Sequence, residues 1–371
     1  MSFLTKANHL TKRNTGLSKL RVMSYFLSQR VNMSGDIGGI HVASNDPPFV
    51  RNLMRCSRDG SGSYDEQAFH AMTIPRVHFY EIHEQPWFPE SARPVVTQMI
   101  PFFWRIFGSR SAAAKSGRIL ARVLRESGSS RIVDCCSGSG GPIIDQINCV
   151  TDLLGNDSGV DFVLTDLYPS LDDFEKLKQQ FPHCIHAINS SVDAINFPLS
   201  RIKNELAKHH IHNGVSDAKN DLLFRLFNAS FHHFDAVQAK QILRDCVEKD
   251  TGIIVFEPAE RSWITLMGII LFPLTIPAWF LISWFITLFL IPKWFGLTRY
   301  HILWTFLIPI APLVFFFDSF MSCLRFYSPS ELNAMIQEVD PTGKFHWEIG
   351  REHVFWPVMT LSYLVGYPKK S

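Results

Sequence analysis

The stretch from residue 131 to residue 142, Arg-Ile-Val-Asp-Cys-Cys-Ser-Gly-Ser-Gly-Gly-Pro, constrains the fold of this chain more than any other. Its apolar beginning predicts the end of a short buried strand, and Pro142 suits the first turn of a following helix. Glycines in the turn between them let a ligand approach the backbone closely. A second apolar run, residues 162–165, leads to Asp166, whose carboxylate can accept hydrogen bonds from ribose hydroxyls. Strand, turn, helix, strand and terminal acid together predict a ligand that carries a ribose.

Two classes of ligand compete for this turn. Dinucleotide enzymes favour G-x-G-x-x-G, because the pyrophosphate binds at the helix N-terminus. Here Gly138 and Gly140-Gly141 are followed by Pro142, so the third glycine of that fingerprint is missing. Asp134, just before the turn, suits a cationic amino-acid moiety better than a diphosphate. A nicotinamide-dependent reductase is therefore the weaker interpretation.

These residues resemble the first motif of class I S-adenosylmethionine-dependent methyltransferases, an acid followed by alternating glycines. Asp134 matches the acid, and Gly138 and Gly140 match the later glycines. Cys136 stands where the family usually has its first glycine. Asp166 matches the family's ribose-binding acid.

The resemblance extends to the middle and the C-terminal tail of the chain. Residues 191–194 resemble the third-strand motif, in which an acid, here Asp193, meets the adenine amino group. Residues 222–234 resemble the fourth strand with its loop, and residues 252–258 the fifth strand. The implied fold is α/β, a Rossmann-like seven-stranded methyltransferase sheet, and the implied cofactor is S-adenosyl-L-methionine. The implied cofactor-binding residues are Asp134, Cys136, Ser137, Gly138, Gly140, Asp166, Leu167, Val192, Asp193 and Asn228.

The loop 228–234, Asn-Ala-Ser-Phe-His-His-Phe, follows the expected fourth strand, at the edge where open α/β sheets bind ligands. Because histidine titrates near neutral pH, His232 or His233 could accept a proton from a substrate hydroxyl or amine. Glu257, at the end of the fifth strand, is a second candidate base. The alternatives are histidines that pack on the cofactor and a glutamate that belongs to an ordinary charge cluster.

Two long blocks, residues 262–292 and 302–317, contain no charged residue. As one helix, residues 263–292 would measure about 45 Å, longer than a bilayer core of about 30 Å. Pro273 and Pro277 predict a kink or break in it. The second block would reach only about 24 Å, which is marginal for a span.

The connector between the blocks, residues 293–299, indicates how they meet a membrane. If the pair crossed a bilayer and returned, Lys293 and Arg299 would lie on the far side from the catalytic domain, against the positive-inside tendency. We therefore predict an inserted hydrophobic helical hairpin that is re-entrant or in-plane, with a two-pass hairpin and a buried apolar subdomain as alternatives. Because the insertion leaves the ligand edge of the sheet, the predicted acceptor is a lipophilic small molecule dissolved in the membrane bilayer.

Several helices and strands can be placed from local signals. Apolar spacing predicts cap helices over residues 95–107 and 112–126, the second ending at Ser127-Gly128, and a helix over residues 171–181. Ser328, Pro329 and Glu331 form a capping box that opens the last helix. Two closing strands follow over residues 346–349 and 358–365. By resemblance, Tyr80, Glu81, Trp87 and Phe88 of the cap could line the pocket. The alternative is that the aromatic side chains belong to the core and the acids face solvent.

The predicted organisation has five parts. They are a disordered basic segment and linker (1–70), an N-terminal helical cap (71–127), an S-adenosylmethionine-binding core (128–261), a hydrophobic membrane-associating insertion (262–324), and the C-terminal helix and closing strands (325–371). Residues 1–35 carry six basic residues and no acid, which fits a mitochondrial transit peptide or a disordered basic tail.

Composition narrows the function classes. The formal net charge of +2 gives no electrostatic support for a nucleic-acid partner. Seven cysteines without a C-x-x-C pair favour a reducing compartment over a disulfide framework. His209, His210 and His212 lack partners at a recognised metal spacing, so we expect no metal. The alternative to an enzyme is a catalytically inactive membrane-anchored binding or scaffold protein with a methyltransferase fold.

Overall fold

The computed structural model describes residues 74–105, 108–155, 159–213, 222–294, 296–355 and 359–369. All of them fall in the structural unit Phe69–Ser371. The predictions for the basic segment and linker, residues 1–70, lie outside the described residues.

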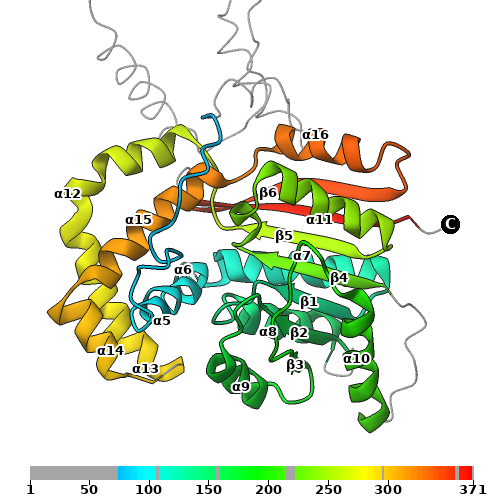
Figure 1. Ribbon diagram of the computed structural model, residues 1–371, viewed down its shortest axis with the longest axis horizontal. Coiled ribbons are helices and arrows are strands. Elements are labelled where there is room, and N and C mark those ends of the chain that lie inside the picture. The colour runs from blue at the N-terminus through cyan, green and yellow to red at the C-terminus, as the bar shows by residue number, and fades with distance from the viewer. Residues whose placement is uncertain are drawn as a thin grey trace, which may run out of the picture. The chain divides into compact units, whose positions relative to one another are not determined.

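A seven-stranded sheet with the order β3-β2-β1-β4-β5-β7-β6 organises the chain (Figure 1). The strands are β1 Arg131–Cys135, β2 Asp161–Thr165, β3 Ile185–Ala187, β4 Leu223–Asn228, β5 Gly252–Glu257, β6 Phe345–Phe355 and β7 Met359–Pro368. β1 to β5 are parallel, whereas β7 is antiparallel to both β5 and β6. This confirms the predicted Rossmann-like α/β fold, and the closing strands are longer than predicted.

Helices cover both faces of the sheet, as the alternation of strands and helices predicted. On one face are α7 (Ala112–Ser127), α8 (Ile143–Leu154) and α9 (Leu171–Gln180). On the other are α10 (Leu199–Asn213), α11 (Ala236–Glu248) and α16 (Pro329–Val339). α7 ends at Gly128 with a φ of 75°, and Ser328 caps α16 with Glu331 in the predicted capping box.

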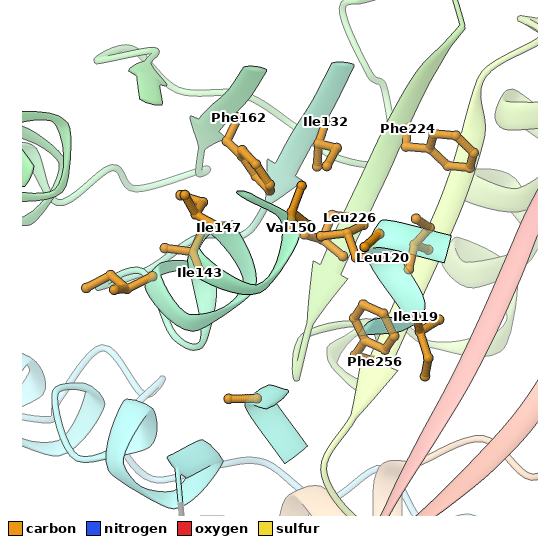
Figure 2. Packing of buried hydrophobic residues seen from close by; sticks show 14 of the residues in the cluster. Ile119, Leu120, Ile132, Ile143, Ile147, Val150, Phe162, Phe224, Leu226 and Phe256 are labelled. Carbon is orange, nitrogen blue, oxygen red and sulfur yellow. The ribbon is translucent and has the colours of Figure 1, made fainter. Parts of the chain in front are cut away.

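Successive residues of the central strands pack into two different cores. Ile132 of β1 belongs to the cluster beneath α7 and α8, whereas its neighbour Val133 belongs to the cluster beneath α10 and α11. Figure 2 shows the first cluster, in which Ile143, Ile147 and Val150 of α8 present one helical stripe to the sheet. Strands buried on both faces explain the continuous apolar runs in the sequence.

The N-terminal cap contains two short helices, α5 (Arg93–Thr97) and α6 (Ile100–Arg105). The predicted single helix over residues 95–107 is therefore wrong. Pro101 has no N–H to bond the preceding turn, and its ring disfavours helical backbone at Ile100, so the chain starts a new helix there.

The first apolar block forms α12 (Trp263–Phe285), the π-helix η4 (Ile286–Leu290) and α13 (Ile291–Trp294). Of the kink or break predicted at Pro273 and Pro277, the break is absent, because α12 runs through both prolines and the helical pattern changes only at η4. Figure 1 shows α12 in yellow bending along its length. A proline inside a helix removes one hydrogen bond and bends the axis, which neighbouring turns here tolerate.

The second apolar block is bent. α14 (Arg299–Ile302) and the π-helix η5 (Leu303–Leu307) meet α15 (Ile310–Arg325) at an angle of 77°. α15 returns beside α12, where Trp279 stacks on Phe316 with ring centroids 4.1 Å apart. By length and composition one described helix, Ile276–Lys293 with a mean hydropathy of 1.6, could cross a membrane, or two if the bent pair counts as one span.

The cap packs against the insertion rather than only against the sheet. A shared apolar cluster joins the two, formed by Phe88, Ala92, Val95, Val96, Met99, Phe102, Ile286, Ile291, Ala311, Val314, Phe315 and Phe316. Polar contacts fix the register, because Asp318 of α15 accepts hydrogen bonds from the backbone N–H groups of Ile82 (2.7 Å) and His83 (3.0 Å). The cap and the insertion therefore form one layer beside the ligand edge of the sheet.

Candidate functional site

The predicted site residues gather where the parallel strands end. Asp134 in β1 is in register with Leu164 of β2 and Leu226 of β4, and Glu257 is the last residue of β5. Because β1, β2, β4 and β5 are parallel, their carboxyl ends share one edge, where open α/β sheets bind ligands.

The turn after β1 has the left-handed backbone that glycine favours. Cys136 has a φ of 60°, and Gly138, Gly140 and Gly141 have φ values of 51°, 92° and 44°. The cysteine that replaces the family's first glycine thus keeps the expected conformation, at some steric cost. At Gly140 a Cβ atom would lie 2.5 Å from Leu177 Cδ1, so a side chain here would require Leu177 to shift as well as a strained backbone.

Asp134 is a buried carboxylate that has no positive partner in the part of the chain that the structure describes. It is 1% exposed, and its Oδ1 accepts a hydrogen bond from Asn228 Nδ2 at 3.1 Å. Burial raises the pKa of Asp134 to about 7, hydrogen bonds from Ser137 and Asn228 oppose the rise, and the charge of Asp166 adds to it. Among the described residues, none of the groups that shift this pKa is a cation. A cationic ligand here would therefore favour the ionised form.

Asn228 is fixed by a buried neighbour that the sequence did not reveal. Gln146 of α8 donates from Nε2 to Asn228 Oδ1 at 2.8 Å and accepts from Asn228 Nδ2 at 3.2 Å. Gln146 Nε2 also bonds Ser116 Oγ of α7 at 3.0 Å. This chain of amides turns the Nδ2 of Asn228 towards Asp134, so Asn228 orients the carboxylate.

Asp166 ties the glycine turn to the neighbouring strand. Its Oδ2 accepts from the backbone N–H of Gly138 at 2.9 Å, and its Oδ1 from that of Tyr168 at 2.8 Å. Its backbone oxygen accepts from Val192 N at 2.9 Å. Each carboxylate oxygen keeps a lone pair for a further donor such as a ribose hydroxyl.

Asp193 lies in the loop after β3, because that strand ends at Ala187; the assignment of residues 191–194 to the third strand is corrected accordingly. Its carboxylate holds its own loop through Ile195 N (2.8 Å) and Asn196 Nδ2 (2.7 Å).

The structure brings the predicted acids around one thiol. Burial raises the pKa of Cys136 well above its usual range, and the charges of Asp166, Asp134 and Asp193 add to the rise. Leu167, beside Asp166, is 45% exposed, whereas Val192 is buried.

A second polar cluster lies at the ends of β4 and β5. His232 is 3% exposed; its Nδ1 lies 3.0 Å from Glu257 Oε2, and its backbone N–H donates to Glu257 Oε1 at 3.1 Å. Its Nε2 faces Glu81 Oε1 at 3.5 Å. Burial lowers the pKa of His232, but the carboxylates of Glu257 and Glu81 outweigh this and raise it to about 9. His232 is thus protonated at neutral pH.

The cap and α15 supply the rest of this cluster. Arg325 Nη1 donates to Glu81 Oε1 at 2.9 Å, and Ser322 Oγ donates to the same oxygen at 2.7 Å. Glu84 Oε1 lies 2.5 Å from Nδ1 of His233. Although burial raises the pKa of Glu84, its contact with His233 lowers it to about 2. Predicted residues from the loop therefore meet partners from two distant segments.

The sequence located only part of this cluster. Glu81 was expected to line the pocket, and it lies here buried, but Tyr80 and Trp87 are 63% and 68% exposed and Phe88 packs in the cap. Glu84, Arg325 and Gln146 were missed. For Arg325 a signal existed, since it follows an apolar block and precedes the last helix, but nothing local indicates its partner.

No protein-family model matches the chain, and no curated protein matches its sequence. The similar solved structures include a human N-acetylserotonin methyltransferase in complex with S-adenosylmethionine, at 11% identity and a TM-score of 0.38, with 87% of this chain and 67% of that chain covered. A mitomycin 7-O-methyltransferase has 13% identity and a TM-score of 0.33, with 76% of this chain and 74% of that chain covered. A protein described as a putative zinc-dependent alcohol dehydrogenase from Rhodobacter sphaeroides has 14% sequence identity and a TM-score of 0.37, with 76% of this chain and 98% of that chain covered. Likenesses this remote carry no functional inference, and the fold assignment depends on the strand order itself.

Proposed function

We propose that this chain transfers a methyl group from S-adenosylmethionine to a small lipophilic acceptor that it meets at a membrane. One observation carries the proposal. Asp134 is a buried carboxylate without a cationic partner among the described residues, beside a glycine turn that Asp166 holds in place. A ligand with a positive charge and a ribose matches both acids.

Each acid would have its own task. Asp134 would hold the ammonium group of the cofactor's amino-acid part, and Asp166 would accept hydrogen bonds from the ribose hydroxyls. Asp193 would meet the adenine amino group, after a change of its present contacts within its own loop. The left-handed turn lets the backbone approach the ligand, because Gly140 has no side chain.

In methyl transfer from a sulfonium, the main contribution of the protein is to align the reacting atoms. The sulfonium supplies the driving force, so the protein places the nucleophile in line with the methyl carbon and the sulfur and excludes water. A base is needed only if the acceptor must lose a proton. Of the three predicted bases, which lie at the same strand ends as Asp134, His232 is already protonated at neutral pH, so His233 and Glu257 are the proposed groups for that step.

The exposed side of the insertion supports a membrane surface as the place of reaction. Large apolar side chains there face solvent, namely Met267, Leu271, Leu274, Leu281, Ile282, Trp284, Phe285, Leu288 and Phe289. Only 22% of the apolar window Ile276–Lys293 is buried. A continuous apolar face of this length is costly in water and suits hydrocarbon.

The contacts on either side of the connector (residues 293–299) favour an in-plane or re-entrant hairpin. His301 Nε2 lies 3.0 Å from Gln98 Oε1 of the cap, and Ile291 is in the shared apolar cluster. The cap in turn approaches the glycine turn through Thr97 and Ser139. A two-pass hairpin would instead carry the connector about 30 Å away from the α/β core.

Titration calorimetry with S-adenosylhomocysteine tests the cofactor assignment. We expect the parent protein to bind it, and Asp134→Ala and Asp166→Ala to bind it at least tenfold more weakly. Asp172→Ala, at an exposed acid in the first turn of α9, is the matched control and should bind like the parent. Equal affinity in all four proteins, or no heat with the parent, would refute the assignment and favour a non-catalytic role.

Labelled-methyl transfer into vesicles of a total lipid extract tests the acceptor class. We expect label in the organic phase, lost in Asp134→Ala, and identification of the product gives the atom that is methylated. Label found only in water-soluble compounds would contradict the lipophilic acceptor while leaving methyl transfer intact.

A further inference from the structure

Two histidines and a carboxylate converge at the polar cluster beside the strand ends. Candidate ligand atoms of Glu81, His232 and His233 all lie within 4.8 Å of one another. Glu81 comes from the cap and the histidines from the loop after β4. The two segments are far apart in the sequence, since Glu84 and its partner His233 are separated by 149 residues.

Each histidine is held through the same ring nitrogen. His232 Nδ1 lies 3.0 Å from Glu257 Oε2, and His233 Nδ1 lies 2.5 Å from Glu84 Oε1. A carboxylate that accepts the Nδ1 proton fixes the ring and leaves Nε2 for another partner. Histidines that bind metal ions almost always donate their other ring N–H to a carboxylate, a backbone carbonyl or water, which orients the ring and raises its basicity.

Among the described residues, the Nε2 of His232 has no hydrogen-bond partner although the residue is 3% exposed. It faces Glu81 Oε1 at 3.5 Å, beyond the usual length of a hydrogen bond. Two ligands about 2.1 Å from one tetrahedral ion lie about 3.4 Å apart. The gap between these two atoms therefore matches the separation of two ligands of one metal ion.

We propose that Glu81, His232 and His233 form a binding site for one divalent transition-metal ion. Two imidazoles and one carboxylate suit zinc, iron(II) or manganese(II), and a set of three leaves coordination positions for water or for an oxygen of another molecule. If the proposed methyl transfer is correct, that molecule is the acceptor; the metal site itself does not depend on this.

The charges around the site agree with a dication. Glu81, Glu84 and Glu257 contribute three negative charges, and Arg325, which pairs with Glu81 and Glu84, contributes one positive charge. A dication would supply the other two once it displaces the proton that His232 carries in its absence. Arg325 would stay behind Glu81 and hold it, as Ser322 does from the same helix.

The other charged groups nearby hold the cap in place, and one of them reaches the site, since His83 Nδ1 lies 3.7 Å from Glu81 Oε2. Asp318 bonds His83 at 2.8 Å, and Arg76 donates to the backbone oxygens of His232 (3.2 Å) and Phe234 (2.9 Å). These contacts fix the loop that carries both histidines against the cap. The sequence predicted no metal because the ligands have no recognisable spacing along the chain, and only the packing of the cap brings them together.

Calorimetric titration of the full chain with Zn²⁺ and with Mn²⁺, after chelator treatment and with a tag free of histidine, tests the site. The titration is made without methyl donor. We expect one ion per chain and at least tenfold weaker binding in His233→Gln and Glu81→Gln. Glu84→Gln, which removes the carboxylate behind His233, should weaken binding by about 10–100-fold. His183→Gln, at an exposed histidine of the loop after α9, should bind like the parent.

His233 carries the test because its side chain is 29% exposed, so its variant keeps the buried His232 in place. Circular dichroism checks that each variant is folded, and Zn²⁺ should raise the Tm of the parent but not that of His233→Gln. Absence of binding by the folded parent, or parent-like affinity in both His233→Gln and Glu81→Gln, would refute the site. Asp134→Ala separates the proposals, since it should bind Zn²⁺ like the parent while losing S-adenosylhomocysteine.

Discussion

At Asp134, the ionisation of one side chain links ligand binding to pH. Because the pKa of this carboxyl is about 7, it is largely protonated at pH 5.5, and a cationic ligand must first displace the proton. We therefore expect the affinity for S-adenosylhomocysteine to rise by roughly tenfold or more between pH 5.5 and pH 8. Calorimetry with Asp134→Asn should give weaker binding and a flat profile; a flat profile in the parent would contradict the assigned role.

The buried carboxyl of Asp134 should also lower the stability of the ligand-free protein as the pH rises. Its pKa is raised from 3.8 in the unfolded chain to about 7 in the folded one, so the folded state binds more protons between these values and its stability falls as pH rises through them. Asp134→Asn should consequently raise the Tm of the ligand-free protein at pH 8 and leave it little changed at pH 4. A lower Tm at pH 8 would show that the ionised carboxylate stabilises the fold.

Gly140 and Gly138 differ in the space around them. Substitutions at the two positions therefore separate the cost of backbone strain from the cost of a steric clash. Both have positive φ, but a Cβ at Gly140 would lie 2.5 Å from Leu177 Cδ1. Among the described residues other than its two chain neighbours, no atom lies within 4 Å of a Cβ at Gly138. Gly138→Ala should cost about 1–2 kcal/mol of unfolding free energy from backbone strain, and Gly140→Ala should cost more. Urea unfolding measures both, and Leu177→Ala added to Gly140→Ala should recover part of the difference.

At the scale of elements, the proposed membrane attachment depends on the exposed face of α12. Leu281 and Phe285, 64% and 55% exposed, are one turn apart on this face. Replacing both by glutamate should abolish co-flotation with liposomes, because charges at the apolar face resist transfer into lipid. Val237→Glu, at a 72% exposed position of α11, should float like the parent. Equal flotation of all three proteins would leave the insertion without a membrane role.

Elements with strong local signals were predicted well, and elements set by packing were not. α7 has an N-cap at Ser111 and a left-handed stop at Gly128, so its limits follow from neighbouring residues. The cap helices broke at Pro101, which the apolar spacing alone did not reveal. α12 continues through Pro273 and Pro277, because packing against α15 sustains a bent helix.

For the whole molecule, the proposed arrangement places the pocket edge beside an apolar layer. An acceptor dissolved in lipid would reach it by lateral diffusion, so the rate should follow the concentration within the bilayer. We expect labelled-methyl transfer into lipid-extract vesicles to slow when phosphatidylcholine dilutes the extract at constant bulk amount. A rate that depends only on bulk amount would indicate that the acceptor arrives from water.

The sequence by itself determined the features that neighbouring residues control. The small residues after β1, the acid at Asp166 and the alternation of strands and helices predicted the sheet, its ligand edge and the acids there. The prediction works because strand burial, turn conformation and helix capping depend on residues a few positions apart.

Only the tertiary structure decided which polar and charged groups, distant in the sequence, pair with one another. Asn228 and Gln146 orient Asp134, and Glu81 from the cap meets Arg325 from α15 and His232 from the loop after β4. No local sequence pattern predicts these contacts, because a buried charge is stable only where the packed fold supplies its partner. The strand ends bring the loop to the edge of the sheet, and the cap and the insertion, by packing on each other, close the cluster above it.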